Sequence, residues 1–410
     1  MNEEQAKGAV SAGVSGTSQD QQEQSPPVFT PPPGNPRFPL FDGLRSVAAV
    51  TILIYHAGSL SGYVQFGRLG AWVTNLNVGV TIFFVISGFL LYRPYVRARL
   101  AGNNGPSVGR FYRRRLLRIV PAYWVALTLL SIYPGSPATF EDWPRFYLFL
   151  QIYTPSPPRE GLFQAWSLCV EMSFYLLLPF YAAFIGRCLR VRSAAARLWS
   201  EIALLVLLSI ASGFATYAWS SGATSPLVQG LPRFMFWFAL GMGLALVSAW
   251  FAQQDQQPNW VVALRRRSWR CWALAVVLFF VLGALTQVPD DGFSFGPKVA
   301  LLQWALGGLI AFLVVLPAAL GGASRSAGAR VLLWRPVVWL GLISYGLFLW
   351  QAGPLLVIFD QRWISSGHWA ARFAEFAALA IAMTIPLAAL SYYLVERPFL
   401  RLKDPRGRAA

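Results

Sequence analysis

The residues best suited to chemistry lie inside apolar segments of this sequence. The chain has two histidines, and one of them, His56, follows Arg45 by eleven residues within a single apolar segment. Eleven helical residues rise roughly 16 Å over about three turns, so one helix would carry both side chains on nearly the same face. Ionisable groups in spanning helices face the bundle interior and mark function, whereas a purely structural histidine would only hydrogen-bond a neighbouring helix.

A carboxylate interrupts a second apolar segment. Glu171 follows Trp166 and Ser167 and is itself followed by a long apolar run. A carboxylate in such a helix must be protonated, paired or hydrated. It could orient a histidine, or it could brace two helices by pairing with an arginine such as Arg233. Both interpretations remain open at this stage.

Arginines gather at the start of a third apolar segment. Arg115 and Arg118 stand one helical turn apart, and Arg114 lies beside them. Guanidinium groups bind phosphate oxygens in a bidentate manner, so this cluster is a candidate phosphate clamp. The same arginines could instead serve only to orient the chain in a membrane.

The elements that carry these residues are predicted to be membrane-spanning helices. Of the 410 residues, 56% are hydrophobic and 12% are charged, against roughly 45–50% and about 25% in soluble domains. A shorter apolar run, 146–153, is predicted to be interfacial or re-entrant, because a span needs about 17 residues or more. The fold class is therefore an all-α, multi-pass membrane bundle of about ten helices. The apolar windows lie near 44–62, 75–92, 119–135, 165–186, 201–219, 232–251, 271–287, 299–319, 336–359 and 370–395.

The basic residues predict the orientation of the bundle. The net charge is +17, and the arginines concentrate in every second break between apolar windows. Because basic loops stay in the cytoplasm, both termini are predicted to be cytoplasmic. The charge is thus explained by topology, and no nucleic-acid partner is expected. The basic breaks are 93–118, 187–197, 265–270, 325–335 and 397–408.

Composition also divides the chain and excludes several protein classes. Residues 1–36 are rich in Gln, Ser, Gly and Pro and are predicted to be a disordered cytoplasmic tail, 37–396 the transmembrane domain and 397–410 a short basic cytoplasmic tail. The chain lacks a glycine-rich phosphate loop, a metal-binding histidine pair and a GxSxG elbow, which argues against an ATP-driven pump, a metalloprotease and a serine hydrolase. Three cysteines at unrelated spacings support neither a disulfide framework nor a metal site: Cys169, Cys188 and Cys271.

Six short motifs recur in order along these segments. They are Phe41-Asp42-Gly43-Leu44-Arg45 with His56, the run 83–90, Arg115 and Arg118 with Pro121, the run from Trp166 to Glu171, Ile343-Ser344-Tyr345, and Glu396-Arg397-Pro398-Phe399. Together they resemble the membrane-bound acyltransferase 3 family, bacterial O-acyltransferases that modify cell-surface polysaccharides and some antibiotics. The resemblance covers nearly the whole chain and implies a multi-pass acyltransferase in the plasma (inner) membrane.

The resemblance also implies roles for individual residues. In that family the spaced arginine and histidine of the first helix are essential, which places these roles on Arg45 and His56. The later arginine motif handles the acyl-coenzyme A donor, a role that falls here on Arg115 and Arg118, with Arg114 as a further candidate. His56 would be the general base or would carry the acyl group briefly. Asp42 and Glu171 are candidates to orient or charge-balance this histidine.

Two departures from the family pattern change the expectations. The family often has a second histidine after its Ser-Tyr motif, and the corresponding residue here is Gln351. Some members carry a hydrolase-like domain after the last helix, so a separate acceptor-handling protein is a possible partner here.

The expected reaction moves an acyl group, most simply acetyl from acetyl-CoA, to a hydroxyl of a carbohydrate or lipid-linked envelope glycan. A macrolide-type metabolite is an alternative acceptor. The alternative from another class is a secondary transporter or exporter of a small polar solute, because intramembrane His, Glu and Arg also form proton relays. No metal cofactor is expected, and membrane lipid surrounds the protein in either case.

Overall fold

The computed structural model describes residues 38–135, 142–153, 162–188, 193–223, 225–254, 256–290, 294–320, 326–361 and 368–403. Within these ranges all regular structure is helical, which confirms the predicted all-α class. The predicted disordered tail, 1–36, and the end of the basic tail, 404–410, lie outside the described residues.

Eight helical segments of the described chain are long and apolar enough to cross a membrane. A candidate ninth span, or a re-entrant pair, is formed by α15 and the segment of α16 and α17, which meet at a bend of 56°. The predicted window 271–287 forms α12, whose 17 residues fall just below the length of a full span. The prediction of a polytopic bundle is confirmed, and its count of about ten becomes eight or nine spans plus one short apolar helix.

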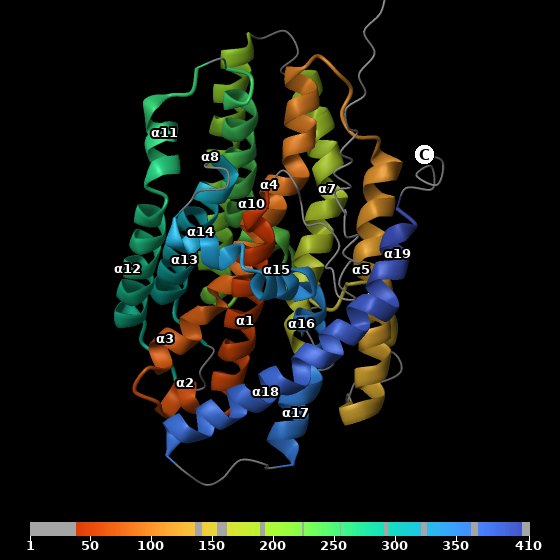
Figure 1. Cartoon of the computed structure of the whole chain (residues 1–410), viewed down its shortest axis with the longest axis vertical. Helices are drawn as coiled ribbons and strands as arrows, with labels where there is room; N and C mark the ends of the chain where they lie inside the picture. The colour runs from red at the N-terminus through yellow and green to blue at the C-terminus, as the bar shows by residue number, and fades with distance from the viewer. Residues whose placement is uncertain are drawn as a thin grey trace, which may run out of the picture. The chain divides into compact units, whose positions relative to one another are not determined.

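The helices run as follows (Figure 1): α1 Leu40–Leu60, α2 Tyr63–Phe66, α3 Gly70–Thr74, α4 Val78–Leu100, α5 Val108–Leu130, α6 Trp143–Tyr147, α7 Trp166–Cys188, α8 Ala194–Ser220, α9 Pro226–Gln229, α10 Leu231–Phe251, α11 Asn259–Arg266, α12 Trp269–Leu285, α13 Pro297–Leu320, α14 Ala327–Leu332, α15 Arg335–Leu342, α16 Ser344–Trp350, α17 Ala352–Asp360, α18 Trp369–Ser391 and α19 Arg397–Arg401. The π-helical turn η4, Tyr392–Glu396, joins α18 to α19, and the 3₁₀ turn η3, Phe163–Ala165, precedes α7.

Helix α5 begins eleven residues before the predicted window. The arginine-rich stretch is itself helical, because Phe111 and Ile119 are buried on one face while Arg113 and Arg114 are exposed on another. Arg115 and Arg118 therefore stand on the same helix that continues into the membrane, as their one-turn spacing predicts.

Close packing of α4 against α10 forms the centre of the bundle (Figure 1). A Cβ atom at Gly88 would collide with the carbonyl oxygen of Phe238, and one at Gly241 would collide with that of Val85. Small residues on both helices thus let the backbones approach, as is usual between membrane helices. Helix α1 packs against α4 on one side and against α15 and α18 on others, so it touches most of the elements that line the site.

The outer helices present large apolar side chains away from the core. Phe214 of α8 is 72% exposed, and Leu207 of the same helix and Phe280 of α12 are also exposed. Such surfaces suit contact with lipid tails and would be unfavourable in water.

The short apolar run between α5 and α7 folds back against α5. Helix α6 and the turns up to Tyr153 bury Phe146 and Ile152. The hydroxyl of Tyr123 donates a hydrogen bond to the carbonyl oxygen of Phe146 over 2.9 Å. The run does not add a span, in agreement with its predicted interfacial or re-entrant character.

The orientation of the bundle can be tested by cysteine labelling. Ser107 caps α5 in the basic break that is predicted to be cytoplasmic, and Ser221 ends α8 in a break predicted to face the other side; both are exposed. In a background with Cys188 and Cys271 replaced, an impermeant thiol reagent applied to intact cells should label Ser221→Cys and leave Ser107→Cys unlabelled. The reverse pattern would mean that the orientation is wrong.

Candidate active site

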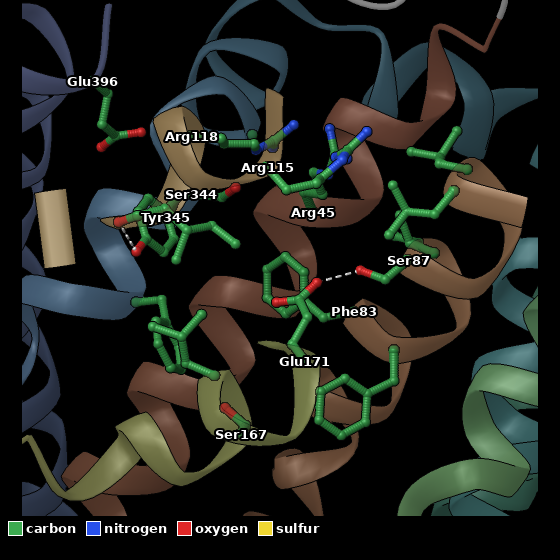
Figure 2. A pocket seen from close by; sticks show the side chains of 18 of the residues that line it. Arg45, Phe83, Ser87, Arg115, Arg118, Ser167, Glu171, Ser344, Tyr345 and Glu396 are labelled. Carbon is green, nitrogen blue, oxygen red and sulfur yellow. Dashed lines mark hydrogen bonds between the residues drawn. The ribbon is translucent and has the colours of Figure 1, made fainter. Parts of the chain in front are cut away.

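Three arginines from two helices line a cavity of about 440 Å³ near the start of α1 (Figure 2). We call it the arginine cavity. Its walls come from α1, α4, α5, α7, the break between α15 and α16, and η4. Its polar lining is Asp42, Arg45, Ser87, Arg115, Arg118, Ser167, Glu171, Tyr175, Ser344, Tyr345, Tyr392 and Glu396.

Two of the three guanidinium groups have no carboxylate partner in the described part of the chain. Arg45 Nη1 lies 3.2 Å from Asp42 Oδ1, so that pair is largely neutralised. Arg115 lies 6.0 Å from the ring centres of both Phe111 and Tyr175, and its buried Nε has no hydrogen-bond partner among the described residues. Arg115 and Arg118 therefore remain available to an anion, which arginine forks bind well.

Glu171 lies beneath the arginines in the same cavity (Figure 2). The hydroxyl groups of Ser87 and Tyr175 each donate to Glu171 Oε1 over 2.5 Å. The carboxylate is thus held by two hydroxyls and not by Arg233. Glu171 therefore braces two helices, as one of the two interpretations predicted, but through a different partner. Ser87 lies on α4 and Glu171 on α7, so the contact ties these helices together at the cavity wall.

The bend between α15 and α16 forms another wall. Tyr345 donates its hydroxyl to the carbonyl oxygen of Ile119 over 2.8 Å, which holds α16 against α5. A Cβ atom at Gly341 would collide with the carbonyl oxygen of Asp42, so a side chain there would push α15 away from α1. Glu396 is only 5% exposed, and its Oε1 has no hydrogen-bond partner in the described ranges.

His56 opens on a second cavity, of about 810 Å³, which we call the histidine cavity. The nearest polar partner of the imidazole is Gln351, whose Oε1 lies 3.1 Å from His56 Nδ1. The ring of Phe163 contacts the imidazole edge-on at 4.9 Å between ring centres. The rest of the polar lining comprises Tyr55, Ser59, Asn77, Gln151, Gln164, Trp166, Trp219, Gln229 and Arg233.

The contacts of Gln351 determine which nitrogen of His56 carries the proton. Gln351 Nε2 donates to the carbonyl oxygen of Phe348 over 3.1 Å. A carbonyl oxygen only accepts, so the amide nitrogen must face Phe348 and the amide oxygen must face His56. The Nδ1 atom of His56 is therefore the protonated donor, and in the neutral ring Nε2 keeps its lone pair.

The two cavities adjoin each other. Ile52, Val80 and Phe348 line both of them. Arg45 and His56 thus line two adjoining cavities along α1 and are separated by roughly 16 Å of helix rise. The two residues share a face of α1, as predicted, but Arg45 lines the arginine cavity and His56 lines the histidine cavity.

The structure separates the predicted site residues into groups. It brings Arg45, Asp42, Arg115, Arg118 and Glu171 together in the arginine cavity. Neither predicted carboxylate hydrogen-bonds His56, since Asp42 pairs with Arg45 and Glu171 with hydroxyls, so neither orients the imidazole by direct contact and their role in balancing its charge stays a prediction.

Arg114 is exposed and does not line the arginine cavity, so the structure does not bring it together with Arg115 and Arg118, and its part in donor binding stays a prediction. The residue that holds His56 is Gln351, which is fully buried. The resemblance marked that position only as one where a histidine is missing. No group of three or more His, Cys, Asp or Glu residues suited to a metal occurs in the described ranges.

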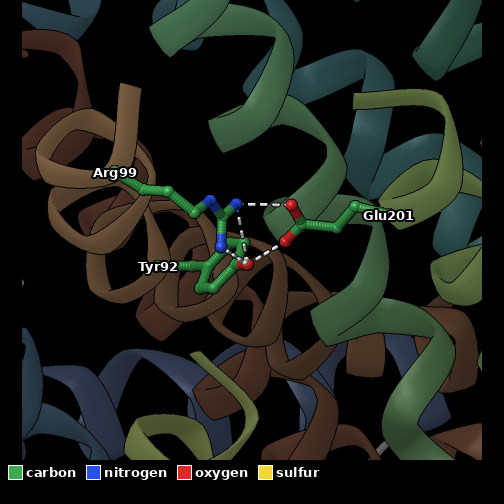
Figure 3. A network of polar contacts seen from close by, with 3 residues as sticks. All are labelled: Tyr92, Arg99 and Glu201. Atoms are coloured by element: carbon green, nitrogen blue, oxygen red, sulfur yellow. Dashed lines mark hydrogen bonds and ion pairs between the residues drawn. The ribbon is translucent and has the colours of Figure 1, made fainter. Parts of the chain in front are cut away.

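A further buried polar cluster lies between α4 and α8 (Figure 3). Glu201 is 1% exposed and accepts hydrogen bonds from the hydroxyl of Tyr92 and from Nη2 of Arg99. The spacing of these residues in the sequence does not reveal the contact, because Glu201 follows Arg99 by 102 residues. This cluster lines neither the arginine nor the histidine cavity, so we assign it to helix packing.

Removing one partner of this cluster should destabilise the protein. Glu201→Ala leaves the partly buried Arg99 guanidinium without its partner; the loss of one partner costs about 3–5 kcal/mol for a fully buried pair and should be smaller here. Replacing both, Arg99→Met with Glu201→Leu, should restore most of that stability because no buried charge remains. Thermal unfolding in detergent checks both; a double variant as unstable as Glu201→Ala would contradict the electrostatic explanation.

Comparison with known proteins agrees with this geometry. A family profile described as an acyltransferase domain matches residues 39–393. YrhL of Bacillus subtilis is 26% identical over 88% of this chain, and the O-acetyltransferase OatA of Staphylococcus aureus is 26% identical over 89%. The peptidoglycan O-acetyltransferase OatA of Listeria monocytogenes is 23% identical over 88%.

These alignments cover 54%, 57% and 55% of the three relatives, so the chain spans little more than half their length. No solved structure matches the chain. The family match extends from the start of α1 to η4 and includes all the residues that line the arginine cavity except Glu396 and Leu400. The chain therefore belongs to the acyltransferase 3 family and has the helices of a multi-pass membrane protein, which favours an acyltransferase over the transporter considered as an alternative.

Proposed function

We propose that this protein is a plasma-membrane O-acyltransferase that moves an acetyl group from acetyl-CoA to a hydroxyl of a carbohydrate or lipid-linked envelope glycan. The observation that carries the proposal is the pair of adjoining cavities along α1. One presents unpaired guanidinium groups, and the other presents an imidazole whose Nε2 is left as a proton acceptor.

The arginine cavity suits the donor. Coenzyme A is a polyanion through its phosphates, and arginine forks match phosphate oxygens. Arg115 and Arg118 would hold these phosphates, with Arg45 lining the same cavity on the path of the donor. The long flexible arm of the coenzyme would then extend past Ile52, Val80 and Phe348 and carry the thioester to the histidine cavity. In the predicted orientation the donor enters from the cytoplasm.

The histidine cavity suits the transfer step. Nε2 of His56 would take the proton of the acceptor hydroxyl while its oxygen attacks the thioester carbonyl carbon, and collapse of the adduct would break the carbon–sulfur bond. The imidazolium would return its proton to the departing coenzyme A thiolate, so an ester and a free thiol result. Gln351 would support this step by accepting from Nδ1–H in both protonation states.

Carriage of the acyl group on His56 itself is the alternative course of the same reaction. In that course Nε2 attacks the thioester carbon and coenzyme A leaves before the acceptor hydroxyl reacts. A rapid-quench experiment without acceptor distinguishes the two, since only the covalent course releases one equivalent of thiol.

The acceptor is inferred from the three relatives, all of which are named as O-acetyltransferases and two of them for peptidoglycan. A separate protein could present the acceptor, as expected from the resemblance. Transfer of label from radiolabelled acetyl-CoA in membranes, followed by mass spectrometry of envelope glycans and secreted metabolites from cells with and without the protein, tests the proposal. Labelled glycan is expected; label found only on a macrolide-type metabolite would reassign the acceptor, and no transfer at all would contradict the function.

Gln351 should act as a positioning residue for His56. Gln351→Leu keeps approximate volume but removes the acceptor of the Nδ1–H bond. We expect kcat to fall about tenfold or more with little change in KM for acetyl-CoA, because imposing the wrong tautomer on a histidine base costs up to about 10⁴-fold. The pH profile of kcat should shift as well, whereas a merely structural glutamine would change thermal stability and leave that profile unmoved.

A further inference from the structure

A third cavity, of about 660 Å³, adjoins the histidine cavity. We call it the tryptophan cavity, because Trp166, Trp219, Trp237 and Trp304 line it. It shares Asn77, Val80, Trp166, Trp219, Arg233 and Phe234 with the histidine cavity. A ligand that reaches His56 could therefore extend into this space.

Arg233 stands at the junction of these two cavities. Its guanidinium carbon lies 5.3 Å from the ring centre of Trp219 and 5.2 Å from that of Phe234. Its side chain forms no ion pair or hydrogen bond with any residue that the structure describes. Its backbone is fixed, because the hydroxyl of Ser212 donates to the carbonyl oxygen of Arg233 over 2.7 Å.

Neither topology nor helix stability explains this arginine. It lies in the first turn of α10, where the helix dipole disfavours a cation. It also belongs to a break that carries few basic residues, so the orientation rule does not call for it. A guanidinium that lines a cavity at the end of a spanning helix, with no partner among the described residues, is a candidate ligand-binding group.

The remaining lining suits a sugar. Trp304 Nε1 is buried without a hydrogen-bond partner among the described residues, and Trp219 offers an aromatic face beside Arg233. Gln303 Nε2 donates to Asn75 Oδ1 over 3.1 Å, and no described residue hydrogen-bonds the amide oxygen of Gln303. Indole faces pack against the C–H faces of a pyranose ring, while indole and amide groups meet its hydroxyls.

We propose that the tryptophan cavity binds the acceptor and that Arg233 recognises an anionic group, a carboxylate or a phosphate, on the acceptor carbohydrate. The inference rests on the proposed function, because the position of this cavity beside His56 is what makes its ligand the acceptor. The cation would select charged over neutral sugars, and stacking would hold the ring with a hydroxyl near Nε2 of His56.

Binding of three soluble sugars to the full-length detergent-solubilised protein tests the inference. N-acetylglucosamine is neutral, N-acetylmuramic acid adds a carboxylate to the same ring, and N-acetylglucosamine 1-phosphate adds a phosphate. The wild type should bind at least one charged sugar roughly tenfold to a hundredfold more tightly than the neutral one, as expected for a charge-assisted hydrogen bond. The charged sugar that binds more tightly identifies the anion, and equal affinity for all three would overturn the proposal.

Variants then test whether Arg233 causes the preference for charged sugars. Arg233→Gln should remove it, and Arg233→Lys should keep part of it, because an ammonium retains the charge without the planar fork. Arg372→Gln is the matched control: Arg372 lies 5.6 Å from the ring centre of Trp369 but lines none of the three cavities, so the preference should persist. A preference that survives Arg233→Gln would assign it elsewhere and overturn the inference.

The two proposals fail separately. Sugar binding is measured without turnover, so it does not depend on His56 acting as a base. Acetyl transfer without a charge preference would overturn only the role of Arg233. A charge preference that depends on Arg233, in a protein that transfers no acetyl group, would overturn the proposed reaction and leave the anionic-sugar site in place.

Discussion

His56→Gln is expected to lower kcat for acetyl transfer by about 10²–10⁴-fold, the usual contribution of a positioned general base. In the wild type His56 Nδ1 lies 3.1 Å from Gln351 Oε1. The amide of a glutamine at position 56 can still donate to that oxygen, and its side chain has a volume similar to that of histidine. What it lacks is a nitrogen that accepts a proton near neutral pH. Initial rates with radiolabelled acetyl-CoA and the melting temperature of the same preparation check the prediction.

The second histidine provides the matched control. His368 caps α18 by accepting from the backbone amide of Ala370, is exposed, and lines none of the cavities. His368→Gln should therefore transfer acetyl groups at the wild-type rate. His56→Ala should also lose transfer while keeping most stability, since hydrogen bonds inside membranes average only about 0.6 kcal/mol. A His56→Gln protein with near wild-type kcat would rule out imidazole chemistry at this position.

The second large effect is expected at the arginine clamp. The double variant Arg115→Ala with Arg118→Ala should raise KM for acetyl-CoA by tenfold or more, because each charge-assisted hydrogen bond to phosphate is worth about 1.5–3 kcal/mol. Insertion and folding should persist, since neither guanidinium pairs with a described carboxylate in the free protein. Steady-state kinetics with varied acetyl-CoA, together with direct binding of coenzyme A, measure the change.

Two further variants separate phosphate binding from net charge. Lysine at both positions should recover only part of the affinity, because an ammonium cannot form the planar bidentate contact. Arg110→Ala with Arg113→Ala removes the same charge from the same helix at exposed positions outside the arginine cavity and should leave KM unchanged. If both double variants raise KM equally, the change reflects the overall positive potential of the basic surface. Arg115 and Arg118 would then only orient the chain in the membrane.

Much of the architecture was predictable because membrane insertion depends on local composition. Apolar windows and their basic breaks predicted an all-helical multi-pass bundle, and helical periodicity predicted that Arg45 and His56 share a face of α1. The bend at 341–344 was missed, since a break inside an apolar window changes backbone direction and leaves hydropathy unaltered. The early start of α5 was missed for a related reason. The first turns of this helix have one buried face and one arginine face, so their average hydropathy is too low to predict a spanning segment.

The partners of each polar side chain depended on helix packing, which no spacing encodes. Gln351 is 295 residues from His56 and Glu201 is 102 residues from Arg99, yet each pair is in contact. The sequence motifs made Asp42 and Glu171 the candidates to orient His56. In the folded chain these carboxylates have other hydrogen-bond partners, and the amide of Gln351 contacts the imidazole instead. The sequence alone determined which polar groups lie in spanning helices. Desolvation makes such groups costly there, so each one marks a site with a function or a partner. Tertiary structure decided which of them meet, because adjacent faces of helices distant in sequence become neighbours only when the bundle closes around its cavities.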